Sequence, residues 1–179
     1  TETEDIKEGF VEIDLSLLQP QSQIIEVTMK WLPSTINQRI ILPNWTPGSY
    51  TVRDHSQYLY DLSIYQNTNS LKSYRESTNT WIFTLDKLDK LTLSYKVIAT
   101  ENTVRTSYLD NNFASLCLTS LIAYSEEMRF KPHRLNVLTI NEWNMYIPLK
   151  GDIIKDAKDY DELVDAPLHA GDFQPNMIS

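Results

Sequence analysis

Apolar and polar residues alternate with a period of two along much of the chain. In residues 11–17 every second residue is apolar, and Glu, Asp and Ser stand between them. Residues 23–31 repeat this pattern, and residues 19–22, Gln-Pro-Gln-Ser, are typical of a turn. Such alternation predicts strands with one buried face, so we expect a β-hairpin at the start of the chain.

The same reasoning extends the strand prediction over most of the remaining sequence. Further strands are predicted at residues 39–42, 58–65, 71–75, 81–85, 91–99, 115–124 and 135–140. Turn-like sequences such as Asn-Thr-Asn-Ser separate most of them, at the spacing expected of a sandwich or barrel. The sequence therefore predicts an all-β fold, a two-sheet antiparallel β-sandwich.

A short helix is expected near the C-terminal end of this sequence. Asp159 can cap the helix, Glu162 three residues later completes a box-like pattern, and Pro167 would stop it. No internal repeat or linker divides the chain before that point. We therefore predict a β-sandwich domain over residues 1–171, with residues 172–179 as the start of a linker.

Composition and charge narrow the classes of partner. The 179 residues are 41% apolar and 22% charged, typical of one soluble globular domain, and no stretch approaches the roughly 20 apolar residues of a membrane span. A net charge of −8 argues against nucleic acid and anionic membrane as partners. The start shows no basic segment followed by an apolar one, which leaves the compartment open, with the cytoplasm favoured.

No local motif predicts a catalytic or metal site. His55, His133 and His169 lie far apart, each is predicted to be a surface or loop residue, and no His-Glu-x-x-His or Cys-x-x-Cys pair is present. Cys117 lies in an apolar run, which favours a buried packing thiol. The Gly-x-Ser-x-Gly elbow of a serine hydrolase is missing as well. We expect neither metal nor cofactor in this chain.

Two dense patches stand outside the alternation. Residues 42–58 contain two prolines and a glycine that force an irregular turn, with a tryptophan able to pin it to the core. We interpret this patch as a rigid structural loop built on Trp45, Pro47, Gly48, Tyr50, Arg53 and Asp54. Residues 104–110, Val-Arg-Thr-Ser-Tyr-Leu-Asp, suit a surface that meets a ligand or another domain, although a plain turn is also compatible.

At these patches the sequence resembles a known family. LPNWTPGSYTVRDHSQYL is similar to the signature in the N-terminal domain of the glycyl aminopeptidase family, metallopeptidase family sixty-one. VRTSYLD resembles the next block of that family, and DYDELVDAP resembles the segment where the domain meets the catalytic one. The three motifs occur in order, and the similarity covers roughly residues 10–173.

The resemblance implies a non-catalytic role for this chain. In that family the β-rich domain precedes a thermolysin-like domain with a His-Glu-x-x-His zinc site, often followed by a PDZ domain. It implies that this chain alone is not an enzyme, and that it packs on its own C-terminal catalytic domain, which would hold the zinc, and borders the cleft for a peptide substrate. Candidate residues for the cleft or the domain interface are Arg105, Thr106, Tyr108, Asp165 and His169. The family often has Glu where His169 stands, and a histidine carries no permanent negative charge.

Two other classes of function stay open. Ten tyrosines and four tryptophans could make a stand-alone β-sandwich that binds peptide or carbohydrate on exposed rings. An independent hydrolase is the third hypothesis. A cluster of Tyr and Trp rings on one open face would favour the binding module.

Overall fold

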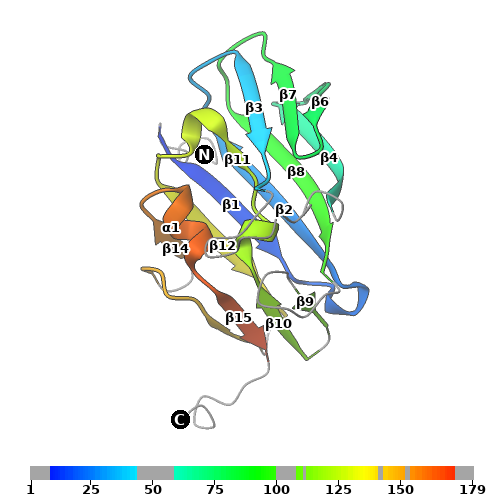
Figure 1. Cartoon of the computed structure of the whole chain (residues 1–179), viewed down its shortest axis with the longest axis vertical. Coiled ribbons are helices and arrows are strands. Elements are labelled where there is room, and N and C mark those ends of the chain that lie inside the picture. The colour runs from blue at the N-terminus through cyan, green and yellow to red at the C-terminus, as the bar shows by residue number, and fades with distance from the viewer. Residues whose placement is uncertain are drawn as a thin grey trace.

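A computed structural model describes residues 9–43, 59–99, 108–110, 112–140, 143–151 and 154–171 of the 179, and the structural statements that follow concern these residues. Three sheets surround one apolar core (Figure 1). The largest sheet has the order β14-β12-β1-β2-β8-β4-β5. Its strands are β1 (Val11–Ser16), β2 (Ile24–Trp31), β4 (Leu59–Gln66), β5 (Asn69–Leu71), β8 (Leu91–Ile98), β12 (His133–Leu138) and β14 (Ile154–Ala157).

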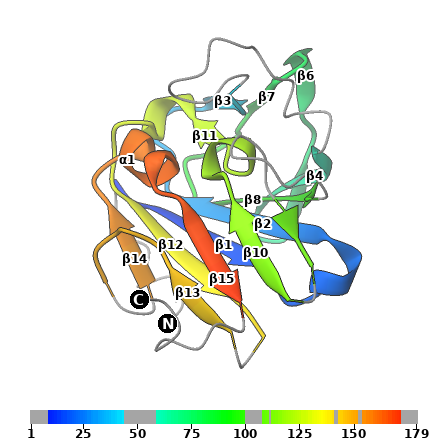
Figure 2. The same cartoon turned by 60° about the horizontal axis from the view of Figure 1, so that its bottom comes forward.

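Two four-stranded sheets complete the domain, one toward each end of the large sheet in Figure 1. One has the order β11-β3-β7-β6, with β3 (Asn37–Ile41), β6 (Tyr74–Ser77), β7 (Thr80–Thr84) and β11 (Tyr124–Ser125). The other has the order β13-β15-β10-β9, with β9 (Tyr108–Leu109), β10 (Phe113–Leu116), β13 (Asn144–Tyr146) and β15 (Leu168–Gly171). Figure 2 shows β13, β15 and β10 side by side.

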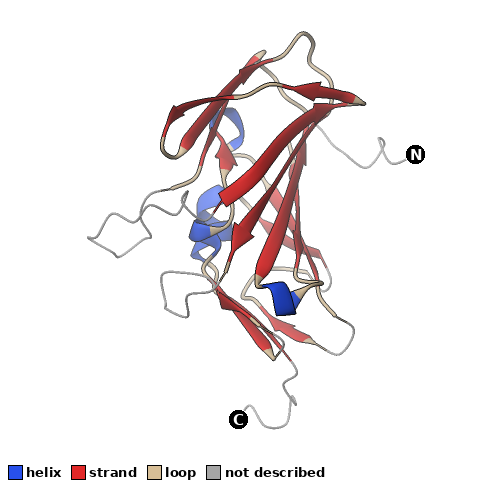
Figure 3. Cartoon of the chain, turned by 90° about the vertical axis from the view of Figure 1, so that its right-hand side faces the viewer, coloured by secondary structure: helices blue, strands red, loops and turns tan. Residues whose placement is uncertain are grey.

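Helical segments are few and short. Within the described residues, the α-helix is α1 (Tyr160–Asp165), and the three single 3₁₀ turns are η2 (Pro20–Ser22), η4 (Leu118–Ser120) and η5 (Glu126–Met128). Figure 3 shows how small this helical share is beside the long strands. None of the helices in the described ranges has the length and apolar content that crossing a membrane requires.

The predicted alternation builds the core. Strand β1 buries every second residue, and β8 does the same. The first hairpin is confirmed, because β1 pairs with β2 in antiparallel register with Val11 opposite Trp31. Trp31 and Met29 are fully buried. The inner face of the large sheet therefore supplies much of the apolar surface that stabilises the fold.

The all-β, sandwich-like class is confirmed, and the structure adds detail to it. The small strands form two separate sheets where one was predicted, and β1 pairs with β12 in parallel. Strands β9, β13, β14 and β15 were not predicted, since two to four residues are too few to show an alternation.

Two predicted strands are wrong as single elements. The range 115–124 holds the end of β10, the turn η4 and the start of β11. Residues 118–123 are buried throughout, so no period of two was present to mark the break. The range 71–75 is divided at residues 72 and 73, between β5 and β6.

The C-terminal helix is confirmed. The Asp159 side chain accepts a hydrogen bond from the Glu162 backbone N–H at 2.8 Å, the N-cap interaction expected from the sequence. The Glu162 carboxylate accepts from the Lys158 N–H at 3.3 Å, not from the N–H of Asp159. The helix ends at Asp165, two residues before Pro167.

One histidine prediction is wrong. His133 is 1% exposed, because its position in β12 directs the side chain to the core side of the sheet. His169 is exposed, as predicted, and Cys117 is half-buried, so that burial raises the pKa of its thiol. His55 lies outside the described residues, and so do the residues of the predicted structural loop, Trp45, Pro47, Gly48, Tyr50, Arg53 and Asp54, so that this prediction stays untested.

Candidate functional site

The sheet β13-β15-β10-β9 brings together two of the residues that the sequence singled out. His169 pairs with Ser115 on one side and with Tyr146 on the other. Ser115 in turn pairs with Tyr108. Directly paired residues of antiparallel strands lie on the same face of a sheet. We call this line of four residues, Tyr146, His169, Ser115 and Tyr108, the β15 row.

The described side chains of the β15 row, those of Tyr146, His169 and Ser115, lie on the outer face of the sheet. His169 is exposed and Tyr146 is 38% exposed, while Ser115 is half-buried. The residues that alternate with them are buried in the core: Ala114, Leu116, Leu168 and Ala170. A second line on the same face consists of Asn144, Gly171 and Phe113. The alternation of two short strands therefore creates an outward surface of hydroxyl, phenol, imidazole and amide groups.

A tight turn positions the edge of this surface. The Asp110 carboxylate accepts hydrogen bonds from the N–H groups of Asn112 and Phe113, at 2.8 and 3.0 Å. The Asp110 N–H donates to the Phe113 carbonyl at 3.0 Å. These bonds hold β9 beside β10, the arrangement that places Tyr108 in the β15 row.

The predicted site residues fall into three groups. Tyr108 and His169 share the β15 row. Asp165 is exposed at the last position of α1, on the connection into β15, and does not belong to the row. Arg105 and Thr106 lie outside the described residues. Sequence reasoning missed Tyr146 and Ser115, because β13 and β10 are too short for their outward positions to stand out.

No described part of the chain forms a metal site. Among the described residues, no group of three His, Cys, Asp or Glu side chains could hold a metal ion. The β15 row offers hydrogen-bond donors and acceptors on an apolar base instead. Such a surface can contact another protein surface or a polypeptide.

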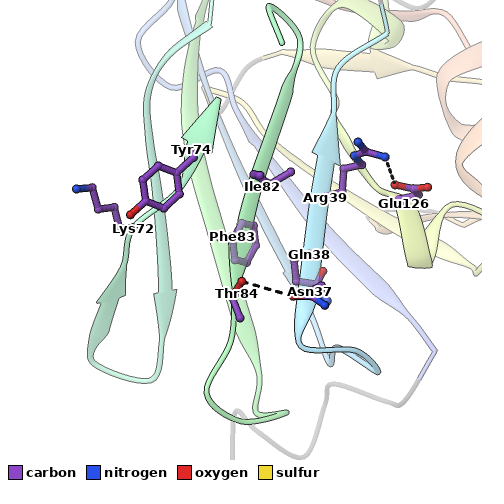
Figure 4. A pocket seen from close by; sticks show the side chains of 9 residues that line it. All are labelled: Asn37, Gln38, Arg39, Lys72, Tyr74, Ile82, Phe83, Thr84 and Glu126. Atoms are coloured by element: carbon purple, nitrogen blue, oxygen red, sulfur yellow. Dashed lines mark hydrogen bonds and ion pairs between the residues drawn. The ribbon is translucent and has the colours of Figure 1, made fainter. Parts of the chain in front are cut away.

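A groove on the other small sheet is the second candidate. It has a volume of about 620 Å³ and lies at β3, β7 and β6 (Figure 4). The register places Arg39, Ile82 and Tyr74 in one row across these strands. The groove is lined by Asn37, Gln38, Arg39, Lys72, Tyr74, Ile82, Phe83, Thr84 and Glu126.

Charges in this groove are largely matched within the chain. Arg39 Nε donates to the Glu76 carboxylate at 2.8 Å, and Arg39 Nη1 lies 3.5 Å from Glu126 Oε2. The hydrogen bond to Glu76 raises the pKa of Arg39, and the same bond lowers the pKa of Glu76. Lys72 Nζ lies over the Tyr74 ring, 5.5 Å from its centroid. The Arg39 guanidinium is thus paired with two carboxylates of the same chain, those of Glu76 and Glu126.

Exposed rings do not cluster here. Tyr74 is 58% exposed, but it is the single aromatic ring on the open side of this groove among the described lining residues, since Phe83 is buried. The described tryptophans, Trp31, Trp81 and Trp143, are all buried. The open ring cluster expected of a carbohydrate- or peptide-binding module is therefore not found at this groove.

The fold is shared with zinc metallopeptidases. The chain superimposes on the M1 zinc metallopeptidase of Deinococcus radiodurans with a TM-score of 0.54 and 9% identity, covering 92% of this chain and 42% of that one. Aminopeptidase A of Legionella pneumophila, solved with aspartic acid, gives a TM-score of 0.54 at 14% identity, covering 96% and 22%. At these identities the likeness concerns the fold alone. The likeness therefore shows that these two proteins contain the same β-rich fold.

The sequence itself identifies the family. Residues 12–172 match the peptidase M61 N-terminal domain, and the chain belongs to that family. An aminopeptidase N family protein of Idiomarina loihiensis is similar at 27% identity and a TM-score of 0.85, over 90% of this chain. The chain spans 29% of the length of that relative. A comparison with curated proteins found no match.

Proposed function

We propose that this chain is the non-catalytic N-terminal domain of a zinc aminopeptidase, and that the β15 row docks on the catalytic domain beside the substrate cleft. Family membership supports the first part, because the domain is one section of longer peptidase-family relatives. The described residues offer no metal-ligand group, so zinc would be held elsewhere in the protein. Peptide hydrolysis would then belong to the intact enzyme.

The contrast between two outer faces supports the docking surface. On the large sheet, Glu12 stands between Arg134 and Lys30 in register, so opposite charges alternate along the row. A charged row of this kind suits contact with water. The outer face of the β15 sheet carries no Lys, Arg, Asp or Glu on its described strands, only Phe113, Ser115, Asn144, Tyr146 and His169 beside Gly171. Depletion of charge together with aromatic residues is typical of the centre of an interface.

The position of β15 in the chain agrees with this choice. β15 is the last strand of the described residues, and it lies in the middle of its sheet between β13 and β10. A domain that follows residue 179 would be connected through this strand. Arg105 and Thr106 precede Tyr108 by three and two residues in the sequence, and both lie outside the described residues.

Two serines allow a matched test in the full-length enzyme. Ser115 and Ser94 are both half-buried, face outward, and occupy an inner strand of their sheet. Ser115→Arg places a large cation in the β15 row, whereas Ser94→Arg places it on the outer face of the large sheet. We expect Ser115→Arg to lower kcat/KM on an aminoacyl substrate at least tenfold and to speed proteolysis after residue 171, while Ser94→Arg leaves both near wild type.

If Ser94→Arg lowers kcat/KM and Ser115→Arg does not, the docking surface lies on the large sheet. Equal activity of both variants and wild type would remove the β15 row from the interface. A separate measurement concerns the chain alone: metal analysis of the 179-residue chain should find no stoichiometric zinc, and no aminoacyl substrate should be cleaved. One tightly held zinc per chain would contradict the assignment of the metal to another domain.

A further inference from the structure

A buried histidine lies where three elements of the fold meet. His133 begins β12, between Val11 of β1 and Ala157 of β14. Its ring lies against Tyr160 of α1, with 5.9 Å between ring centroids. With 1% of its surface exposed, the side chain is enclosed by the sheet and the helix.

The hydrogen bonding of His133 defines its neutral form. The Nδ1 atom lies 2.7 Å from the carbonyl oxygen of Lys131. A carbonyl only accepts, so Nδ1 carries the proton and donates it, and Nε2 is bare in the neutral ring. Nε2 is buried and has no hydrogen-bond partner among the described residues. A second proton would therefore create a buried cation whose new N–H has no acceptor.

Nearby charges do little to offset this cost. The Asp159 carboxylate favours the cation, but it also caps α1 through the Glu162 N–H. Asp161 is occupied by Arg129, whose Nη2 lies 3.3 Å from Asp161 Oδ1.

The uncharged neighbours of His133 are engaged in contacts of their own or are apolar. The Tyr160 hydroxyl donates to the Ile122 carbonyl at 2.6 Å, and the Tyr160 ring packs on Tyr124 at 4.6 Å. From β1 and β14 the paired residues are Val11 and Ala157, which are apolar and buried. Burial lowers the pKa of His133, although the Lys131 carbonyl and Asp159 act in the opposite direction.

We propose that His133 is a proton-sensitive lock on α1. The neutral imidazole supports Tyr160 and keeps α1 on the sheet, while protonation favours a state in which α1 has moved away and the ring reaches water. Since α1 leads directly into β15, the change would reach the β13-β15-β10-β9 sheet through residues 166 and 167.

The direction of the pH effect follows from linkage. The docked state binds fewer protons than the open state, because its histidine is the weaker base. The stabilisation of docked α1 is complete above the ordinary histidine pKa of about 6.5, and it is lost as the pH falls below that value toward the lowered pKa. Within that window the opening equilibrium constant rises by up to about tenfold for each pH unit.

Hydrogen exchange on this chain between pH 8 and pH 5, corrected for the intrinsic rate at each pH, tests the proposal. Amides of α1 and β15 should lose protection below pH 6.5, approaching tenfold per pH unit, while those of β2 and β8 keep theirs. His133→Gln retains an amide that can donate to Lys131 and cannot titrate in this range. In this variant the amides of α1 and β15 should therefore keep their protection below pH 6.5. His169→Gln, at an exposed histidine, should behave like wild type.

The same loss of protection in His133→Gln as in wild type would overturn the proposal, and so would uniform loss over all strands. If His133→Gln does not fold, an NMR titration of the ring in the wild-type chain decides. A His133 pKa below 6.5, with α1 resonances shifting in parallel, supports the lock. A pKa at or above 6.5, or α1 resonances that do not follow it, excludes the lock.

Discussion

The two faces of the segment 159–171 use polar groups in opposite ways. On the core side, the Tyr160 hydroxyl of α1 and the Tyr95 hydroxyl of the neighbouring sheet strand β8 are buried, and each bonds to main-chain groups within residues 121–123. On the outer side of β15, His169 is exposed beside Ser115 and Tyr146. Buried polar groups are committed to stability, because leaving one unsatisfied is costly. Exposed groups are not so constrained, and they can contribute to recognition. Four substitutions test this division.

The largest effect is expected from Tyr160→Ala. The change removes a buried ring that contacts Tyr124 and His133, together with the hydroxyl bond to Ile122. Loss of such a side chain should lower the free energy of unfolding by about 3–5 kcal/mol. Urea unfolding of the 179-residue chain measures it. A midpoint equal to that of wild type would show that the region beneath α1 is not part of the core.

Tyr95→Phe isolates the hydrogen bonds from the packing. The Tyr95 hydroxyl donates to the Leu121 carbonyl at 2.6 Å and accepts from the Ala123 N–H at 2.9 Å. Burial raises the pKa of Tyr95 far above its ordinary value, so this hydroxyl stays protonated as the donor. We expect a loss of about 2 kcal/mol by thermal or urea unfolding, because two buried main-chain groups lose a partner. A free energy of unfolding equal to that of wild type would mean that water replaces the Tyr95 hydroxyl.

Asp159→Ala probes the boundary between the two faces. Its carboxylate caps the first turn of α1, and removal of a cap typically costs about 1 kcal/mol. The chain should remain folded, with faster hydrogen exchange in α1 than in β2 or β8. Asp159→Asn, which keeps an accepting oxygen, is the control and should recover most of the loss.

The smallest effect on stability is expected from His169→Ala. An exposed side chain on a strand surface should change the free energy of unfolding by less than about 0.5 kcal/mol in the 179-residue chain. In the full-length enzyme the same substitution should lower kcat/KM, if the β15 row docks on the catalytic domain. A destabilised chain with unchanged enzyme activity would assign His169 to the fold, contrary to the comparison.

Local patterns in the sequence determined the main architecture. Long strands such as β1, β2 and β8 have enough residues to show a period of two, so both their existence and their buried faces were predictable. The cap at Asp159 was predictable too, because a cap and its partner lie three residues apart. The three family motifs led to the M61 N-terminal domain, which the match over residues 12–172 confirms.

Only the tertiary structure decided which distant residues share a surface. Tyr146, His169, Ser115 and Tyr108 form one row because four strands pair in a register that depends on long-range packing, and strands of two to four residues carry no pattern that reveals it. The burial of His133 was hidden for the same reason. An imidazole is polar in any sequence, and whether it meets water or Tyr160 depends on a helix that begins 27 positions later in the chain.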